Sequence, residues 1–244
     1  MPELRRGRYL SRQVDSEADL AAALALRAAC FRGGAPDEDG FDSVCRHMLI
    51  EDSATSRALC TFRLLPLPGG RAIDGSYAAQ HYDLRRLAAY PAPMIELGRF
   101  CIRPEAAGNP DILRLAWGTL ARVIDAEGAQ LLFGCSSFAG TEATRYGDAF
   151  GMLRDRHQAP PGWLPRVKAT DVIRFAVARL PRIPDPKAAL RAMPPLLRSY
   201  LAMGGWVSDH AVVDRDLGTL HVFTGLEIAA IPPARARALR AVAG

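Results

Sequence analysis

The feature that most constrains this chain is an apolar run with two charged residues inside it, MIELGRFCI at residues 94–102. A run of this length and composition is typical of a buried strand. Burying a charge costs several kcal/mol unless the charge is paired or used in function. Alternation places Glu96 and Arg99 on opposite faces, so they share a face only across a β-bulge, which Gly98 favours. The sequence predicts an internal ion pair, an edge strand with one wet face, or a functional site.

Helix and strand patterns alternate along the chain, which predicts an α/β (α+β) fold. Ser16 is suited to cap a helix that ends near Phe31, and Asn109–Pro110 to open one that ends near Ala126. Small residues at 134–141 predict a tight turn at a strand end. The expected strands are residues 7–14, 45–51, 57–65, 94–102, 131–137, 170–178, 206–213 and 220–227, and shorter helices are expected at 84–89, 142–150 and 196–203.

Residues 158–195 differ in composition from the preceding part of the chain, because they are rich in proline. We expect a core at 1–157, a connecting segment with one strand at 158–195, and a helix and strands at 196–244. This last part completes the same domain and ends in a basic tail.

Composition excludes several classes of protein. With 49% hydrophobic and 23% charged residues among 244, the chain is not disordered, and no apolar stretch reaches the roughly 18 residues of a membrane span. Five scattered cysteines without a C-x-x-C pair indicate reduced thiols of a cytosolic protein. The N-terminal arginines precede no apolar region, so no signal peptide is expected. No metal-ligand pattern or other short catalytic motif occurs. We therefore expect a cytoplasmic protein without a bound metal.

The formal net charge is +5, and nearly all of the positively charged residues are arginines. Basic clusters at the two ends favour contact with an acidic protein or an anionic membrane surface, or simply form a solvated surface. No nucleic acid partner is expected, because aromatic residues are only 7% and no binding motif accompanies the charge. The clustered residues are Arg5, Arg6, Arg8, Arg12, Arg235, Arg237 and Arg240.

Two aspartates precede a predicted strand, and an arginine interrupts the next one. Asp39 and Asp42 are three residues apart, and Arg63 lies in the run CTFRLLP. Carboxylates hold an ammonium group and arginine holds an acid, so such a set can bind a small zwitterion. The alternative is that the aspartates cap local backbone amides. His47, in the same region, is more often a packed histidine than a catalytic base.

Several separated motifs together resemble the acyl-carrier-protein-dependent N-acyltransferases that begin ornithine lipid synthesis. The resemblance covers about residues 8–227. It implies a GNAT-like fold, with a mixed, twisted central sheet flanked by helices and a C-terminal extension. It also implies transfer of a 3-hydroxyacyl chain from acyl carrier protein to the α-amine of an amino acid, with ornithine as the expected acceptor. The motifs are ELGRFCI at 96–102, FRLLP at 62–66, D-x-x-D-x-x-C-x-H at 39–47, LLFGCSSF-x-GT at 131–141 and PPLLR-x-YL-x-x-GGW at 194–206.

The resemblance also implies roles for individual residues. Glu96 is the expected catalytic residue, which positions the amine or accepts its proton. The expected acceptor-binding residues are Arg27, Phe31, Asp39, Asp42, Arg63, Arg99 and Phe100, and the expected pantetheine-binding residues are Cys101, Ile102, Arg103 and Gly108.

The run RPEAAG at 103–108 departs from the pyrophosphate loop of acetyl-CoA-dependent GNAT proteins. An alanine stands where the first glycine belongs, and a carboxylate lies inside the loop. A phosphopantetheine arm carries one phosphate, so the departure favours acyl carrier protein as donor, with no further cofactor. Helix N-termini bind such phosphates readily, and an acidic carrier suits the basic chain.

Three alternatives stay open. Acyl-homoserine lactone synthases share several of these motifs, so a signal synthase is the second enzyme hypothesis. Glutamine, lysine or glycine could replace ornithine in a remodelled pocket. The non-enzymatic alternative is a carrier-protein or membrane-binding module on an inactive acyltransferase fold.

Overall fold

The computed structural model describes residues 3–243, and their contacts group the chain into two compact units. The first unit contains the described residues up to Pro66, then Ile95–Ala129 and the residues from Pro233 onward; the second contains Leu67–Met94 and Gln130–Pro232. Both combine strands with helices, so the expected mixed α/β fold is confirmed. The boundaries expected at residues 157 and 195 stay a prediction.

The first unit is built on strands in the order β1-β2-β3-β4-β6. The pairs β1–β2, β2–β3 and β3–β4 are antiparallel, and the register of β3 on β4 shifts between Ile50 and Glu51. The strands are β1 (Leu4–Arg6), β2 (Tyr9–Gln13), β3 (Arg46–Asp52), β4 (Arg57–Leu67) and β6 (Met94–Ile102). The hairpin expected around residues 52–57 and the strand at 94–102 are therefore confirmed.

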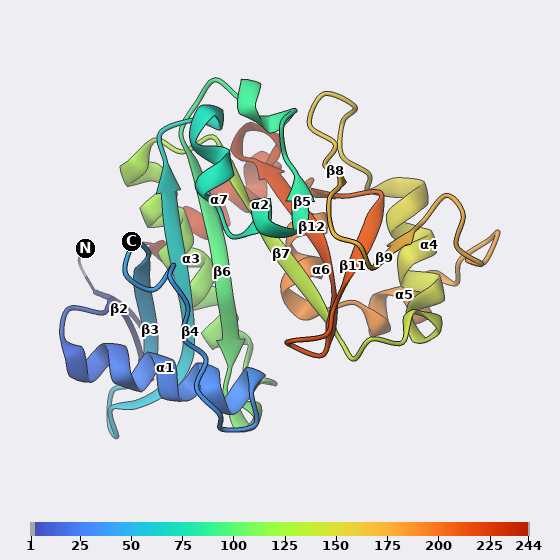
Figure 1. The fold of residues 1–244 in the computed structure, drawn as a ribbon. Coiled ribbons are helices and arrows are strands. Elements are labelled where there is room, and N and C mark those ends of the chain that lie inside the picture. The colour runs from blue at the N-terminus through green and yellow to red at the C-terminus, as the bar shows by residue number, and fades with distance from the viewer. Residues whose placement is uncertain (1–2, 244) are drawn as a thin grey trace. The chain divides into compact units, whose positions relative to one another are not determined.

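Helices α1 (Glu17–Phe31) and α3 (Pro110–Glu127) lie on opposite faces of these strands, α1 in front and α3 behind (Figure 1). Both caps are as predicted. The Ser16 hydroxyl accepts from the backbone N–H of Asp19 at 3.2 Å, and the Asn109 side chain accepts from that of Asp111 at 2.9 Å. A short 3-10 helix, η3 (Pro104–Ala106), precedes α3. Within residues 3–243, no helix has the length and apolar character needed to span a membrane.

The expected basic tail forms a helix. Alanine and arginine are strong helix formers, and they make up most of α7 (Pro233–Ala243). This helix packs against α3, where Gly118 leaves room for Val242: a Cβ built on the glycine would lie 2.7 Å from the valine Cγ1.

In the second unit the strands run in the order β7-β12-β11-β9, and β10 also pairs with β12. The β7–β12 ladder is antiparallel and joins nine residue pairs. The strands are β7 (Leu131–Ala139), β9 (Val172–Arg174), β10 (Trp206–Val207), β11 (His210–Asp214) and β12 (Thr219–Glu227), with a separate pair, β5 (Tyr82–Asp83) and β8 (Arg166–Val167). The helices are α2 (Ala78–His81), α4 (Gly147–Arg156), α5 (Pro186–Ala192) and α6 (Pro195–Ala202), with 3-10 turns η1 (Gly70–Gly75), η2 (Leu87–Ala89), η4 (Ala143–Tyr146) and η5 (Ile228–Ala230).

Three local expectations were wrong in this unit. The strand expected at 131–137 is confirmed and continues to Ala139, because β12 pairs with the whole segment, so the turn expected at 134–141 does not form before Gly140. The strand expected at 170–178 is only three residues long, since the chain turns back where the Ala178 N–H donates to the Arg174 carbonyl. The strand expected at 206–213 is split at Ser208, whose hydroxyl donates to the His210 carbonyl and accepts from the Phe223 N–H.

Candidate functional site

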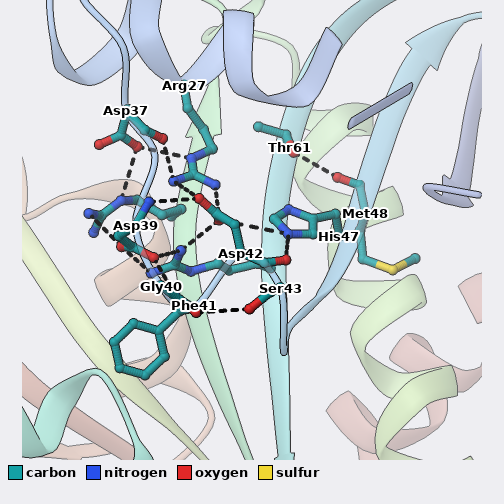
Figure 2. Close-up of polar contacts among 12 residues, drawn as sticks. Arg27, Asp37, Asp39, Gly40, Phe41, Asp42, Ser43, His47, Met48 and Thr61 are labelled. Atoms are coloured by element: carbon teal, nitrogen blue, oxygen red, sulfur yellow. Dashed lines mark hydrogen bonds and ion pairs between the residues drawn. The ribbon is translucent and has the colours of Figure 1, made fainter. Parts of the chain in front are cut away.

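A buried network of arginine and aspartate side chains joins four parts of the first unit (Figure 2). The aspartates come from the loop between α1 and β3, and the arginines come from α1, its C-terminal cap, β4 and β6. Figure 2 shows Asp37 and Asp42 turned towards Arg27, with His47 beside Asp42. The members are Arg27, Arg32, Asp37, Asp39, Asp42, Arg63 and Arg99.

Asp37 is the deepest carboxylate of the network, with only 1% of its side chain exposed. It accepts from the Nε atoms of Arg27 at 2.9 Å, Arg32 at 3.2 Å and Arg99 at 3.0 Å. The Arg27 Nη2 also donates to the Asp37 backbone carbonyl at 2.6 Å. Three guanidinium groups around one carboxylate offset the desolvation cost of burying it. Their hydrogen bonds also fix the position of this part of the loop.

Arg63 holds the other two aspartates. Its two Nη groups donate to the two oxygens of Asp39 at 2.6 and 2.8 Å, a bidentate contact, and Nη1 also reaches Asp42 Oδ1 at 2.8 Å. Arg27 donates to Asp42 from the opposite direction. The Phe41 ring lies 5.4 Å from the Arg63 Cζ, in the range of a cation–π contact. The geometry is directional, which lysine cannot reproduce.

Burial and the arginines act in opposite directions on these carboxyl groups. Burial raises the pKa of each aspartate, but the hydrogen bonds and charges of the arginines outweigh it and hold the pKa of Asp37 and Asp39 below the usual value. For Asp42 the balance lowers the pKa to about 2. All three are therefore anionic at neutral pH.

The aspartates cap local backbone amides, which was the alternative expected for them, and their expected role in binding a zwitterion stays a prediction. The Asp42 carboxylate accepts from the Asp39 N–H at 3.0 Å, and that of Asp39 accepts from the Phe41 N–H at 2.9 Å. His47 contacts the Asp42 carbonyl through Nε2 at 3.0 Å, and burial lowers the pKa of its imidazole. A buried, neutral ring of this kind is a packing residue.

Strand β6 departs from regular geometry at Arg99, where φ is +51°. The irregularity expected at Gly98 therefore lies one residue later. A side chain in this region costs on the order of 1–2 kcal/mol, and the ion pairs of Arg99 with Asp37 and Asp39 hold it there. Gly98 lies beside the Arg63 side chain: a Cβ built on it would be in van der Waals contact with the Arg63 Nε, at 3.4 Å.

Glu96 lies on β6 near this network and is 4% exposed. It stands close to Cys45: burial raises the pKa of that thiol to about 11, and the negative charge of Glu96 adds to the shift. The two aromatic residues expected to bind the acceptor lie in different surroundings. Phe100 stacks on Phe62 with centroids 5.6 Å apart, whereas Phe31 packs beside the buried cluster formed by α1 and the sheet.

The residues expected to bind pantetheine follow Arg99 directly. The Cys101 side chain lies in the core, where its hydrogen bond to Cys30 lowers the pKa of Cys30 to about 7. Cys101 can therefore offer a ligand only its backbone. Ile102 accepts from the Cys30 thiol through its carbonyl at 3.7 Å. Arg103 is fixed to β4 by hydrogen bonds to Ala58 and Leu59. Gly108 is exposed, with open space around it.

Sequence reasoning missed two groups of polar residues. Asp37 and Arg32 complete the network, and the signal for Asp37 was its place beside two other loop aspartates. The second group is a histidine cluster in the second unit. There the Tyr82 hydroxyl donates to the His221 carbonyl at 2.9 Å, and burial, with His81 and His210 nearby, lowers the pKa of His221 to about 3.

We predict that Asp37→Asn destabilises the protein by about 3 kcal/mol or more, because it leaves buried arginines without their shared anion. Asp171→Asn is the matched control, since that carboxylate pairs with Arg215 at the surface and a surface pair contributes at most about 1 kcal/mol. Chemical denaturation measures both values. Equal, small losses would contradict a network that depends on Asp37.

The same network predicts acid sensitivity. Because the folded-state pKa values of the three aspartates are depressed, their stabilisation is complete above the unfolded value near 4. It is lost as the pH falls from about 4 through about 2, where Asp42 titrates. The free energy of unfolding of Asp37→Asn should vary less over this range than that of the wild type.

Known proteins resemble this chain over most of its length. Residues 27–117, which hold the network from Arg27 to Arg99, match the family model described as an acetyltransferase (GNAT) domain. The L-ornithine N(alpha)-acyltransferase of Rhodobacter capsulatus is 32% identical over 191 residues, covering 76% of this chain and 72% of that protein. The Brucella abortus protein of the same name is 30% identical over 200 residues, covering 79% and 70%.

Among solved structures, a GNAT-like decarboxylase in complex with isobutyryl-CoA is 14% identical, with a TM-score of 0.50, covering 89% of this chain and 98% of that one. That likeness concerns the fold alone. The sequence identity to the curated relatives goes further: this chain is an acyltransferase and belongs to the L-ornithine N(alpha)-acyltransferase family.

Proposed function

We propose that the protein transfers an acyl chain, expected to be 3-hydroxylated, from acyl carrier protein to the α-amine of ornithine. The product is an N-acyl-ornithine, the first intermediate of an ornithine lipid. The observation that carries this proposal is the 32% identity to a curated L-ornithine N(alpha)-acyltransferase over 72% of its length. The buried charges of the first unit then supply the groups that such a reaction needs.

The reaction is aminolysis of a thioester. The deprotonated α-amine attacks the thioester carbonyl, a C–N bond forms, the C–S bond breaks, and the leaving thiolate takes up the proton that the amine nitrogen gives up. The amine loses its extra proton to Glu96, directly or through a water molecule. The backbone N–H groups of β6 around the irregular Arg99 would bind the thioester oxygen or the pantetheine amides. The thioester supplies the activation, so we propose no further cofactor.

Ornithine brings one carboxylate and two ammonium groups, and the network contains partners for both signs. Asp39 is the most exposed of the three aspartates, with 24% of its side chain accessible, and is the proposed partner of the side-chain ammonium. Arg99 or Arg63 is the proposed partner of the α-carboxylate. Both already hold aspartates in this geometry, so a bound acceptor would share them. A zwitterion carries a positive and a negative group, so it can pair with an aspartate and an arginine of the network at once. This limits the free-energy cost of sharing them.

The proposed donor is acyl carrier protein rather than acyl-CoA. The segment from Arg103 to Gly108 has an alanine at 106 and a carboxylate at 105, and Glu105 pairs with Arg57 at 3.2 Å. This segment leads into the N-cap of α3, where backbone N–H groups suit a single phosphate. An acidic carrier also suits the net positive charge of the chain. The proposed location is cytoplasmic, where carrier and ornithine are both present.

If Glu96 accepts the proton, Glu96→Gln lowers kcat by about 100-fold or more, the usual scale of general acid–base catalysis, and leaves the melting temperature almost unchanged. Glu3→Gln is the matched control, since this exposed carboxylate of the first unit pairs with Arg5 at the surface and has no part in the proposed chemistry. A destabilised but proportionately active Glu96→Gln protein would show that Glu96 is a structural partner instead.

The function itself is tested with the purified protein, matched acyl-ACP and acyl-CoA donors, and a panel of amino acids, with product masses measured by mass spectrometry. We expect N-acyl-ornithine from acyl-ACP, at a rate that falls as salt screens the carrier. Equal efficiency with acyl-CoA, independent of salt, would overturn the donor. A glutamine, lysine or glycine product would overturn the acceptor, an acyl-homoserine lactone would indicate a signal synthase, and no product would indicate an inactive module.

A further inference from the structure

Several apolar side chains of the second unit are exposed to solvent. They lie on a segment whose backbone is firmly anchored. Ile183 is 91% exposed and Val177 is 80% exposed, and both lie between β9 and α5. Leu190 on α5 is 47% exposed. In Figure 1 this yellow-orange connection extends away from α4 and α5 as a loop. We name residues 176–191 the β9–α5 surface.

The backbone of this surface is held in place by α4. Pro181 and Pro184 pack over Gly147 and Gly151, one helical turn apart, and a Cβ on Gly151 would lie 2.7 Å from the Pro184 Cγ. The Arg154 guanidinium donates to the Pro181 carbonyl at 3.2 Å. Ile183 lies between these two anchored prolines, and its side chain is exposed to solvent.

Basic residues surround these apolar side chains. Residues 174–198 contain six basic residues and one acidic residue, Asp185, whose carboxylate accepts from the Lys187 N–H. Among residues 3–243, the side chains of Arg179, Arg182, Lys187 and Arg191 are exposed and form no ion pair.

Helix α5 repeats the pattern on one face. Lys187, Leu190 and Arg191 have the i, i+3, i+4 spacing that puts side chains on the same side of a helix, and all three are exposed. Ala189, on the opposite side, is fully buried in the core of the unit. Leu180 and Ala192 also pack against that core, so the surface is held to it at both ends.

The N-terminal arginines, in contrast, are largely neutralised. Arg12 pairs with Asp19 and Glu51, Arg8 with Asp52, and Arg6 with Asp111. On α7, Arg240 forms a bidentate pair with Asp125, whereas Arg235 and Arg237 remain exposed without exposed large apolar neighbours. Of the three basic surfaces compared within the described part of the chain, the β9–α5 surface combines unpaired cations with protruding apolar side chains.

We propose that the β9–α5 surface binds an anionic lipid bilayer. The exposed isoleucine, valine and leucine would enter the interface between headgroups and acyl chains, while the arginines and Lys187 contact lipid phosphates. Binding to anionic membrane interfaces combines these two contributions, apolar insertion and electrostatic attraction. This inference goes beyond the proposed function, because it depends on neither the donor nor the acceptor.

The test is sedimentation of the full chain with phosphatidylcholine vesicles, with and without 30% phosphatidylglycerol. We expect binding only to the anionic vesicles, weakened by salt. Val177→Ser with Ile183→Ser should lower the partition coefficient about ten-fold or more. Arg179→Gln with Arg182→Gln should lower it about five-fold per arginine. Acyl transfer in vesicle-free solution should stay at the wild-type level in both variants.

Two controls match these variants. Arg235→Gln with Arg237→Gln removes two exposed cations from α7, and Val44→Ser removes an exposed apolar side chain of the first unit. Both should bind vesicles like the wild type. The proposal is overturned if the wild type does not bind anionic vesicles, or if the β9–α5 variants bind them unchanged. It is also overturned if those variants alter only self-association or affinity for acyl carrier protein.

Discussion

The ion pairs around Asp37 are the interaction on which the first unit depends. A buried carboxylate with three guanidinium partners adds little net stability compared with an apolar core, but removing one partner leaves charges in a place that water does not reach. The network therefore permits one arrangement of the loop between α1 and β3. It also holds Arg99 at a positive φ, and so links the shape of β6 to the loop.

Much of the fold could be predicted from the sequence because local rules decide it. Ser16 and Asn109 start their helices by side-chain capping, and apolar periodicity sets strands β3, β4 and β6. The sequence-based predictions fail where pairing with distant parts of the chain determines the local structure. The strand expected at 131–137 continues to Ala139 because β12 pairs with the whole segment, although small residues at 134–141 predicted a turn.

The candidate site shows the same division. Charges within apolar strands singled out Arg63 and Arg99 as candidates for ion pairs or for a site, but sequence spacing could not show that loop aspartates hold both. Asp37 was missed because its place beside two other loop aspartates was its only local signal. Its importance arises from Arg27, Arg32 and Arg99, which only the folded chain brings to it.

The central claim is that the Asp37–Arg99 contact joins the loop to β6. A double-mutant cycle with Asp37→Asn, Arg99→Met and the combined variant tests it, with the free energy of unfolding as readout. We predict a coupling free energy above about 1 kcal/mol, as found for contacting residues in one ion network. Additivity of the two single changes to within about 0.3–0.5 kcal/mol, the range for independent sites, would contradict the account.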